Sequence, residues 1–151
     1  MKGTNMQKNS VSARLEGEGQ SIDVRIKLSG LWISTMLMFA YVDLFGFFRA
    51  DVLENALAGK VYIFDVSQTF LLLTTLYVVI PSVMVVLSLI IRPPRNRIMN
   101  VVASVVYIVT IGLSMVGEEW IYFLAGSLVE IVLLLTITYV AWTWPRTPAD
   151  F

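Results

Sequence analysis

The chain has 151 residues, of which 57% are hydrophobic and 15% are charged, and its formal net charge is zero. A chain of this length holds one domain, and this composition differs strongly from that of a soluble domain. It contains no histidine and no cysteine, which excludes thiol chemistry, bis-histidine haem ligation and zinc sites of the Cys/His kind. Nucleic-acid binding has no support, because no basic face exists outside the loops.

The N-terminal segment, residues 1–26, is polar and mixed in charge. Such a composition favours a flexible tail, which we predict to be cytoplasmic. The segment does not resemble a secretory signal peptide, because the first apolar run begins late, is too long and lacks a small-residue cleavage site.

Four apolar stretches follow, and each is long enough to cross a bilayer as a helix. They are Leu28–Phe48, Thr69–Ile91, Ile98–Val116 and Trp120–Trp144. A spanning helix needs about 20 apolar residues at a rise of about 1.5 Å per residue. We therefore predict an all-α membrane protein in which residues 27–145 form an antiparallel bundle of four transmembrane helices. Residues 146–151 are then a cytoplasmic C-terminal tail.

The first connection is the long one, and its sequence predicts a helix followed by an extended piece. Apolar residues recur with helical spacing over Asp51–Ala58, and Gly59 is suited to a C-cap. We expect a short amphipathic helix on the outer surface, then an extended piece at Val61–Val66. The apolar side of the helix either rests on the bundle or serves as a lid or a docking element for a partner.

The other two connections are short. The second and third spans are joined by a basic turn, residues 92–97, which contains two prolines and three arginines. Prolines disfavour a continuing helix, and arginines suit anionic lipid headgroups. Gly117–Glu119 links the last two spans, and we interpret its two glutamates as markers of the outer turn.

The distribution of positive charge predicts the orientation. Nine of the eleven Lys and Arg residues fall in the two tails and the second connection, and only Arg49 and Lys60 fall on the opposite side. By the positive-inside rule both termini are cytoplasmic, in a cell inner (plasma) membrane. Trp32, Trp120 and Trp142 are expected to lie at the level of the lipid headgroups.

Glu130 is the strongest candidate for a functional residue. It lies 11 positions after Glu119, which places it roughly 16 Å below the outer surface in a helix. No span offers a basic residue at that depth to pair with it, so we expect a protonated carboxyl that seeks hydrogen bonds.

Tyr107 and Tyr77 reach a similar depth and are the predicted partners of Glu130. Pro81 cannot donate a backbone hydrogen bond, which frees the carbonyl of Tyr77 and favours a kink near the same plane. We hypothesise a polar cavity around Glu130 for proton exchange or for a small polar or cationic ligand. The alternative is a protonated glutamate that only fixes the register of the helices.

Asp43 is the second candidate, five residues before the end of the first span. In one interpretation Asp43 lies at the entrance of the polar cavity and Glu130 lies at its inner end. In the other it is a helix-end acid that is solvated or paired at the headgroup level, where Arg49 can neutralise it by folding back.

Three short motifs resemble an uncharacterised family of small prokaryotic four-span membrane proteins, loosely grouped with DoxX-like bundles. They are Lys27–Ile33 (KLSGLWI), Tyr41–Gly46 (YVDLFG) and Ala141–Trp144 (AWTW). The resemblance covers about Lys27 to Pro145. It implies the four-helix architecture and a bacterial or archaeal inner membrane, and it implies no chemistry.

Two functional classes follow from these observations. The first is a binding or transport-related protein built around Glu130, expected to be a homo-oligomer because four helices are few for a complete transporter. The second is an accessory or structural subunit that associates with another membrane protein. An enzyme is not expected, since no nucleophile–base pair, phosphate loop or metal-binding pattern occurs. The expected partners include the lipid bilayer and exclude nucleic acid, and the sequence identifies no cofactor.

Overall fold

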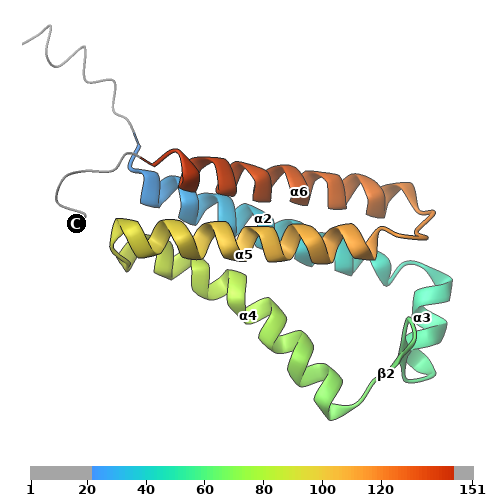
Figure 1. Cartoon of the computed structure of the whole chain (residues 1–151). Coiled ribbons are helices and arrows are strands. Elements are labelled where there is room, and N and C mark those ends of the chain that lie inside the picture. Colours follow the sequence, from blue (N-terminus) through green and yellow to red (C-terminus); the bar gives the residue numbers. More distant parts are fainter. Residues whose placement is uncertain (1–21, 145–151) are drawn as a thin grey trace, which may run out of the picture.

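The computed structural model describes residues 22–144, which form an all-α bundle with one small hairpin (Figure 1). Its elements in chain order are α2 (Val24–Gly46), α3 (Ala50–Leu57), β1 (Lys60–Val61), β2 (Phe64–Asp65), α4 (Gln68–Ile90), α5 (Pro93–Ser114) and α6 (Ile121–Trp142). The four long helices are each long and apolar enough to cross a membrane. The predicted fold class is confirmed.

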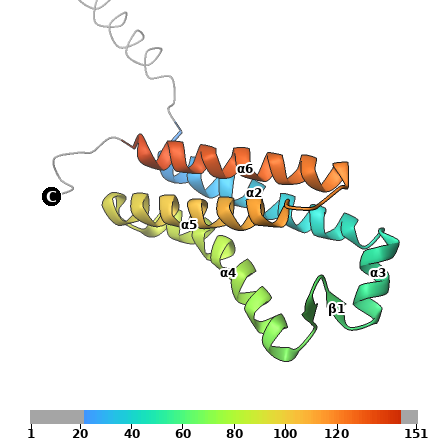
Figure 2. The same cartoon turned by 45° about the vertical axis from the view of Figure 1, so that its right-hand side comes forward.

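The four long helices alternate in direction, so the bundle has two distinct ends (Figures 1 and 2). At one end α2 begins, α6 finishes and α4 turns into α5; we call this the terminal end. At the other lie α3, the two strands and the link between α5 and α6; we call this the hairpin end. Large apolar side chains are exposed along all four long helices, as expected of surfaces that face lipid.

Two helices begin earlier than the sequence predicted. Asp23 caps α2 by accepting a hydrogen bond of 2.8 Å from the Arg25 backbone N–H, so Val24 is already helical. Helix α5 begins at Pro93 rather than after the basic turn. Proline is compatible with the first turn of a helix, where backbone N–H groups have no partner within the helix. The rest of the predicted N-terminal tail and the C-terminal tail lie outside the described residues.

The first connection contains the predicted amphipathic helix, α3, and Gly59 follows it with a φ of 72°. The predicted extended piece is a tight antiparallel hairpin, in which Val61 pairs with Phe64. The apolar side of α3 does not rest on the bundle, since none of its residues is buried and Leu57 is 81% exposed. The short link after Gly46 holds α3 beyond the end of the bundle, where it lies against β1 instead.

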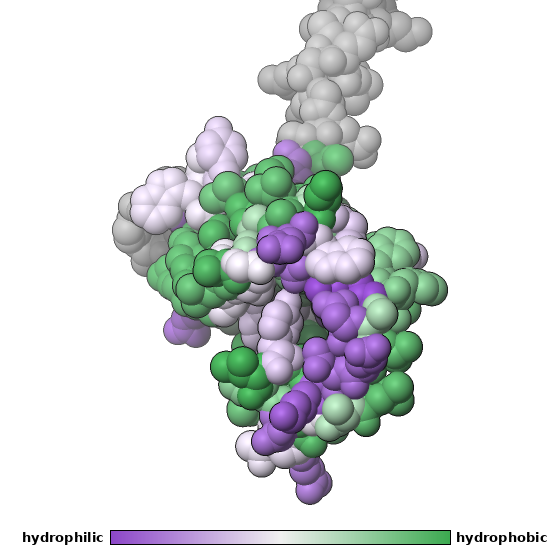
Figure 3. All heavy atoms as spheres, turned by 90° about the vertical axis from the view of Figure 1, so that its right-hand side faces the viewer, coloured by the Kyte–Doolittle hydropathy of each residue, from purple (hydrophilic) through white to green (hydrophobic). Residues whose placement is uncertain are grey.

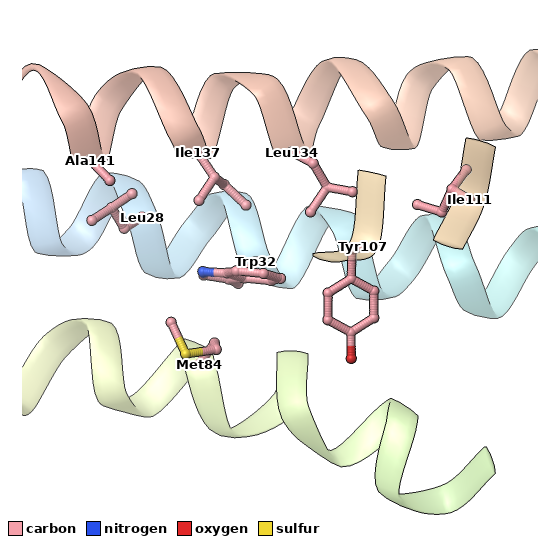
Figure 4. Close-up of a cluster of buried hydrophobic side chains, with 8 residues drawn as sticks. All are labelled: Leu28, Trp32, Met84, Tyr107, Ile111, Leu134, Ile137 and Ala141. Carbon is pink, nitrogen blue, oxygen red and sulfur yellow. The ribbon is translucent and has the colours of Figure 1, made fainter. Parts of the chain in front are cut away.

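The core of the bundle is a continuous apolar cluster shared by α2, α4, α5 and α6 (Figure 4). Its buried members are Leu28, Trp32, Met84, Tyr107, Ile111, Leu134, Ile137 and Ala141. Helices α2 and α6 approach closely beyond this cluster, where a Cβ atom on Gly126 would overlap with Cγ2 of Val42. A glycine at this position therefore sets the separation of the two helices.

Helix α4 packs along only half of its length. Near the terminal end Pro81, Met84 and Ser88 are buried, whereas every residue over 71–80 is exposed. These ten residues cover all sides of the helix, so the segment is largely uncovered by the rest of the described chain, apart from the contacts of Tyr77 with Tyr107 and Thr110 on α5. The cartoon shows α4 diverging from the other three long helices toward the hairpin end (Figures 1 and 2).

Candidate functional site

Glu130 lies on the inner face of α6 and is 4% exposed. It makes no hydrogen bond to any described residue, yet every fully buried side-chain nitrogen and oxygen in residues 22–144 has a hydrogen-bond partner. The carboxylate oxygens of Glu130 therefore belong to the small accessible part of the residue. A buried acid with accessible, unpaired oxygens can accept a proton or a ligand from outside the protein.

Asp43 lies on α2, which packs beside α6. Its neighbour Val42 contacts Gly126, which lies one turn before Glu130 on the same face of α6. Asp43 itself is exposed. The structure thus places the part of α2 that carries Asp43 beside the part of α6 that carries Glu130.

The two tyrosines do not make the predicted hydrogen bonds to Glu130. The Tyr107 hydroxyl donates instead to the backbone carbonyl of Tyr77, which is the carbonyl that Pro81 leaves free. The Tyr77 hydroxyl bonds with that of Thr110 at 2.7 Å. This correction has a simple cause, because a carbonyl without its helical partner must be satisfied within lipid. Helix α4 is thereby attached to α5 just where it begins to diverge.

Aromatic rings surround this attachment. The ring centroid of Tyr107 lies 4.7 Å from that of Tyr77, 5.8 Å from that of Phe39 and 6.2 Å from that of Trp32. Figure 4 shows the Tyr107 side chain extending from α5 toward α4. Tyr107 is buried, whereas Tyr77 is exposed on the diverging half of α4.

Arg49 does not neutralise Asp43 as predicted, because it is held at the hairpin end by other acids. Its guanidinium contacts both carboxylate oxygens of Glu118 at 3.1 Å and that of Asp51 at 2.6 Å, and it lies 4.7 Å from the centroid of the Trp120 ring. Tyr62 of the hairpin turn also hydrogen-bonds to Glu118 at 3.2 Å. We call Arg49, Asp51, Tyr62 and Glu118 the Arg49 cluster.

Glu118 is therefore more than a marker of the outer turn, since its side chain is only 5% exposed and connects three loops. Burial opposes its ionisation, but hydrogen bonds from the Trp120 backbone N–H and from Arg49 outweigh burial and lower the pKa of Glu118. Figure 3 views this end of the molecule and shows hydrophilic residues gathered on it beside hydrophobic ones.

A second buried polar group, which the sequence analysis missed, lies near the terminal end. Asn100 accepts hydrogen bonds from the Trp32 indole N–H at 2.7 Å and from the Ser88 hydroxyl at 3.2 Å, and it donates to Asn96 Oδ1 at 2.6 Å. Asn96 donates to the Ser88 carbonyl at 2.7 Å. We call these four residues the Asn100 network; it joins α2, α4 and α5.

The Asn100 network also corrects the placement of Trp32. The indole is 0% exposed in the core instead of lying at the headgroup level, because its N–H finds an acceptor inside the bundle. A sequence signal for the network existed. Asn96, Asn100, Ser104 and Tyr107 recur every three or four residues and so share one face of α5.

The described residues contain no group of three or more acidic side chains that could hold a metal ion. The chemistry available around Glu130 is therefore that of two carboxylates, hydroxyl groups and aromatic rings. Such a set can bind a proton, a polar group or a cation.

A comparison with known protein families gives a match over most of the chain. The model of a family of unknown function, DUF6326, matches residues 20–149. No curated protein and no solved structure gives a significant match. The match supports an uncharacterised family and gives no support to a DoxX-like relation. With four helices that can span a membrane and a family match from end to end of the bundle, the chain belongs to the DUF6326 family.

Proposed function

We propose that this protein binds a small ligand within the bilayer at Glu130, and that binding is coupled to the protonation of this carboxyl group. In this proposal Asp43 and Tyr77 flank the bound ligand, and Tyr107 holds α4 in the position that leaves Glu130 accessible. The positive-inside pattern of the loops supports an inner-membrane protein with both termini in the cytoplasm.

One observation carries the proposal: Glu130 is buried in the middle of α6 and has no hydrogen-bond partner among the described residues. A carboxyl group at the centre of a spanning helix costs about 2.5 to 3.5 kcal/mol on insertion scales. A purely structural glutamate would recover part of that cost through hydrogen bonds to neighbouring helices. Glu130 makes no such hydrogen bond among the described residues.

Infrared spectroscopy of the protein in lipid nanodiscs tests the proposal. The C=O band of a protonated carboxyl should change reversibly as the pH is varied, and E130Q should abolish that change. E119Q is the matched control, which removes an exposed carboxylate outside the proposed site and keeps the band of Glu130. Thermal unfolding of E130Q and E130L checks that the variants fold.

Two results would contradict the proposal. One is a Glu130 band that stays constant over the whole pH range in which the protein remains folded. The other is a loss of stability in E130Q as large as that in E130L, which would make Glu130 a structural residue. The protein would then be better described as an accessory subunit, whose partner should co-purify at a fixed ratio in mild detergent.

A further inference from the structure

We propose that the ligand of the Glu130 site is a monovalent organic cation with apolar substituents, which reaches the site from the bilayer beside the diverging half of α4. This inference rests on the proposed function and adds the chemical class of the ligand. It follows from the charges, the rings and the surfaces around Glu130.

The charge around Glu130 is negative and has no positive counterpart in the described part of the bundle. Helix α6 carries no Lys or Arg, and neither does α4. The basic residues of α2 and α5 lie in their first two turns at the terminal end. At the hairpin end Arg49 is occupied by Asp51 and Glu118, and Lys60 is exposed on β1, outside the four long helices. A positive charge that pairs with Glu130 must therefore come from outside residues 22–144, as a proton or as a cation.

The aromatic rings favour an organic cation over a neutral ligand. The faces of tyrosine and phenylalanine rings attract positive charge, and they do so more strongly where water is excluded. Tyr77 offers an exposed ring whose centroid lies 4.7 Å from that of Tyr107, a member of the buried core cluster. The hydrogen bond of 2.7 Å between the Tyr77 and Thr110 hydroxyls holds that ring in place.

The same surroundings disfavour a metal ion. Calcium takes about six to eight oxygen ligands, and magnesium requires a nearly octahedral set. No group of three acids that could hold a metal ion occurs among the described residues. A cation with apolar substituents needs fewer polar contacts, because its surface does not have to keep a shell of water.

The exposed half of α4 favours access from the bilayer. Residues 71–80 present apolar side chains on all sides, apart from the two threonines at 74 and 75. Both threonine hydroxyls bond to backbone carbonyls of their own helix, at 3.0 and 2.8 Å. The bonds of this segment to another helix are those of Tyr77 with Thr110 and Tyr107, so an amphiphilic cation can move along the rest of this surface without breaking hydrogen bonds between helices.

Binding in this scheme exchanges one positive charge for another. The cation pairs with the Glu130 carboxylate, and the proton released from Glu130 passes to the buffer. Away from the terminal end, the other ionisable groups on the neighbouring helices are Tyr41 and Asp43 on α2, Tyr77 on α4 and Tyr107 on α5.

Tetraphenylphosphonium and tetraphenylborate form a suitable pair of probes, because they have similar size and apolar surface but opposite charge. Binding of each is measured by equilibrium dialysis against the protein in nanodiscs of zwitterionic lipid, with empty nanodiscs as the blank. Proton release is followed with a pH indicator in weak buffer. We expect saturable binding of the phosphonium with release of about one proton per cation, and no protein-dependent binding of the borate.

Variants then assign the binding to the site. E130Q should weaken phosphonium binding by roughly tenfold or more and abolish proton release, since it removes the carboxylate that pairs with the cation and releases the proton. Y77L should weaken binding several-fold, whereas Y77F should bind nearly as well as the parent, because the ring face and not the hydroxyl makes the contact. E119Q, an exposed glutamate outside the site, should change nothing.

The inference is overturned if the borate binds as well as the phosphonium, or if E130Q binds the phosphonium as the parent does. Its failure differs from that of the proposed function. Should the infrared band of Glu130 titrate while the phosphonium fails to bind, the site exists and the ligand class is wrong. Should the band not titrate, both proposals fail.

Discussion

The two ends of the bundle differ in whether their buried polar groups have hydrogen-bond partners. At the terminal end the Asn100 network pairs every one of its members, across three helices, with bonds of 2.6 to 3.2 Å. Toward the hairpin end Glu130 is buried without a partner, and α4 diverges from the bundle. Mutually satisfied polar groups fix helices in place, whereas an unsatisfied one is available to a proton or a ligand. The comparison separates a structural half from a candidate functional half.

The largest expected loss of stability follows from a substitution of Asn100. N100L removes the acceptor of the Trp32 N–H and of the Ser88 hydroxyl, and leaves them buried among apolar groups. We expect a loss of about 2–4 kcal/mol in the free energy of unfolding. Unfolding in mixed micelles with increasing SDS, followed by circular dichroism, measures it.

T74V is the matched control for N100L. The Thr74 hydroxyl bonds only to the Phe70 carbonyl of its own helix, on the exposed half of α4, so its loss should be nearly neutral. Equal losses of stability in N100L and T74V would show that the hydrogen bonds at the terminal end do not stabilise the bundle more than those on the diverging half of α4.

The second effect concerns the contact between α2 and α6. G126A places a Cβ atom against Cγ2 of Val42 and should destabilise the bundle by about 1–3 kcal/mol, because valine has few alternative rotamers in a helix. G112A has open space around the new atom and should be neutral or slightly stabilising. The same micelle unfolding assay compares them, and a neutral G126A would mean that the helices separate freely.

The third effect is a pH dependence of the Arg49 cluster. Because the pKa of Glu118 is lowered in the folded protein from its ordinary value of 4.5, its contribution to stability is complete above that value. It is lost as the pH falls through the lowered pKa. We expect E118Q to be less stable than the parent by about 1 kcal/mol at neutral pH, since the cluster lies at the end of the bundle, where water screens it.

The difference between E118Q and the parent should shrink as the solution is acidified below the ordinary glutamate range. Stability of both proteins over a pH series tests this, with E54Q as the control, since Glu54 is exposed on α3. If the parent remains more stable than E118Q in acid, Glu118 stabilises the protein through its packing and not through its charge.

The smallest change in stability is expected from a substitution of Pro81. This substitution directly tests why α4 diverges from the bundle toward the hairpin end. P81A restores a backbone N–H that can bond to the Tyr77 carbonyl, in competition with the Tyr107 hydroxyl. We expect α4 to straighten and its diverging half to shift relative to α6. Distances between spin labels placed at positions 71 and 124 measure the shift, and Y107F separates the loss of the hydroxyl from the gain of the N–H. An unchanged distance distribution in P81A would assign the divergence of α4 to another cause.

Local patterns in the sequence determined the fold. Four apolar stretches of bilayer length give four spanning helices whatever their packing, because backbone polar groups in lipid must be satisfied within each helix. The helical spacing of apolar residues over Asp51–Ala58, followed by Gly59, likewise predicted α3. The local sequence also suffices to predict that α5 begins at Pro93, because proline is compatible with the first turn of a helix.

Only the tertiary structure decided which polar group meets which. Depth along a helix is set by a rise of about 1.5 Å per residue, but the direction of a side chain depends on how neighbouring helices rotate and tilt. For that reason Tyr107 pairs with the Tyr77 carbonyl and not with Glu130, Arg49 with Glu118 and not with Asp43, and Trp32 with Asn100 and not with lipid headgroups. Glu130 is not paired with the two tyrosines predicted as its partners, since the hydroxyl groups of both bond elsewhere.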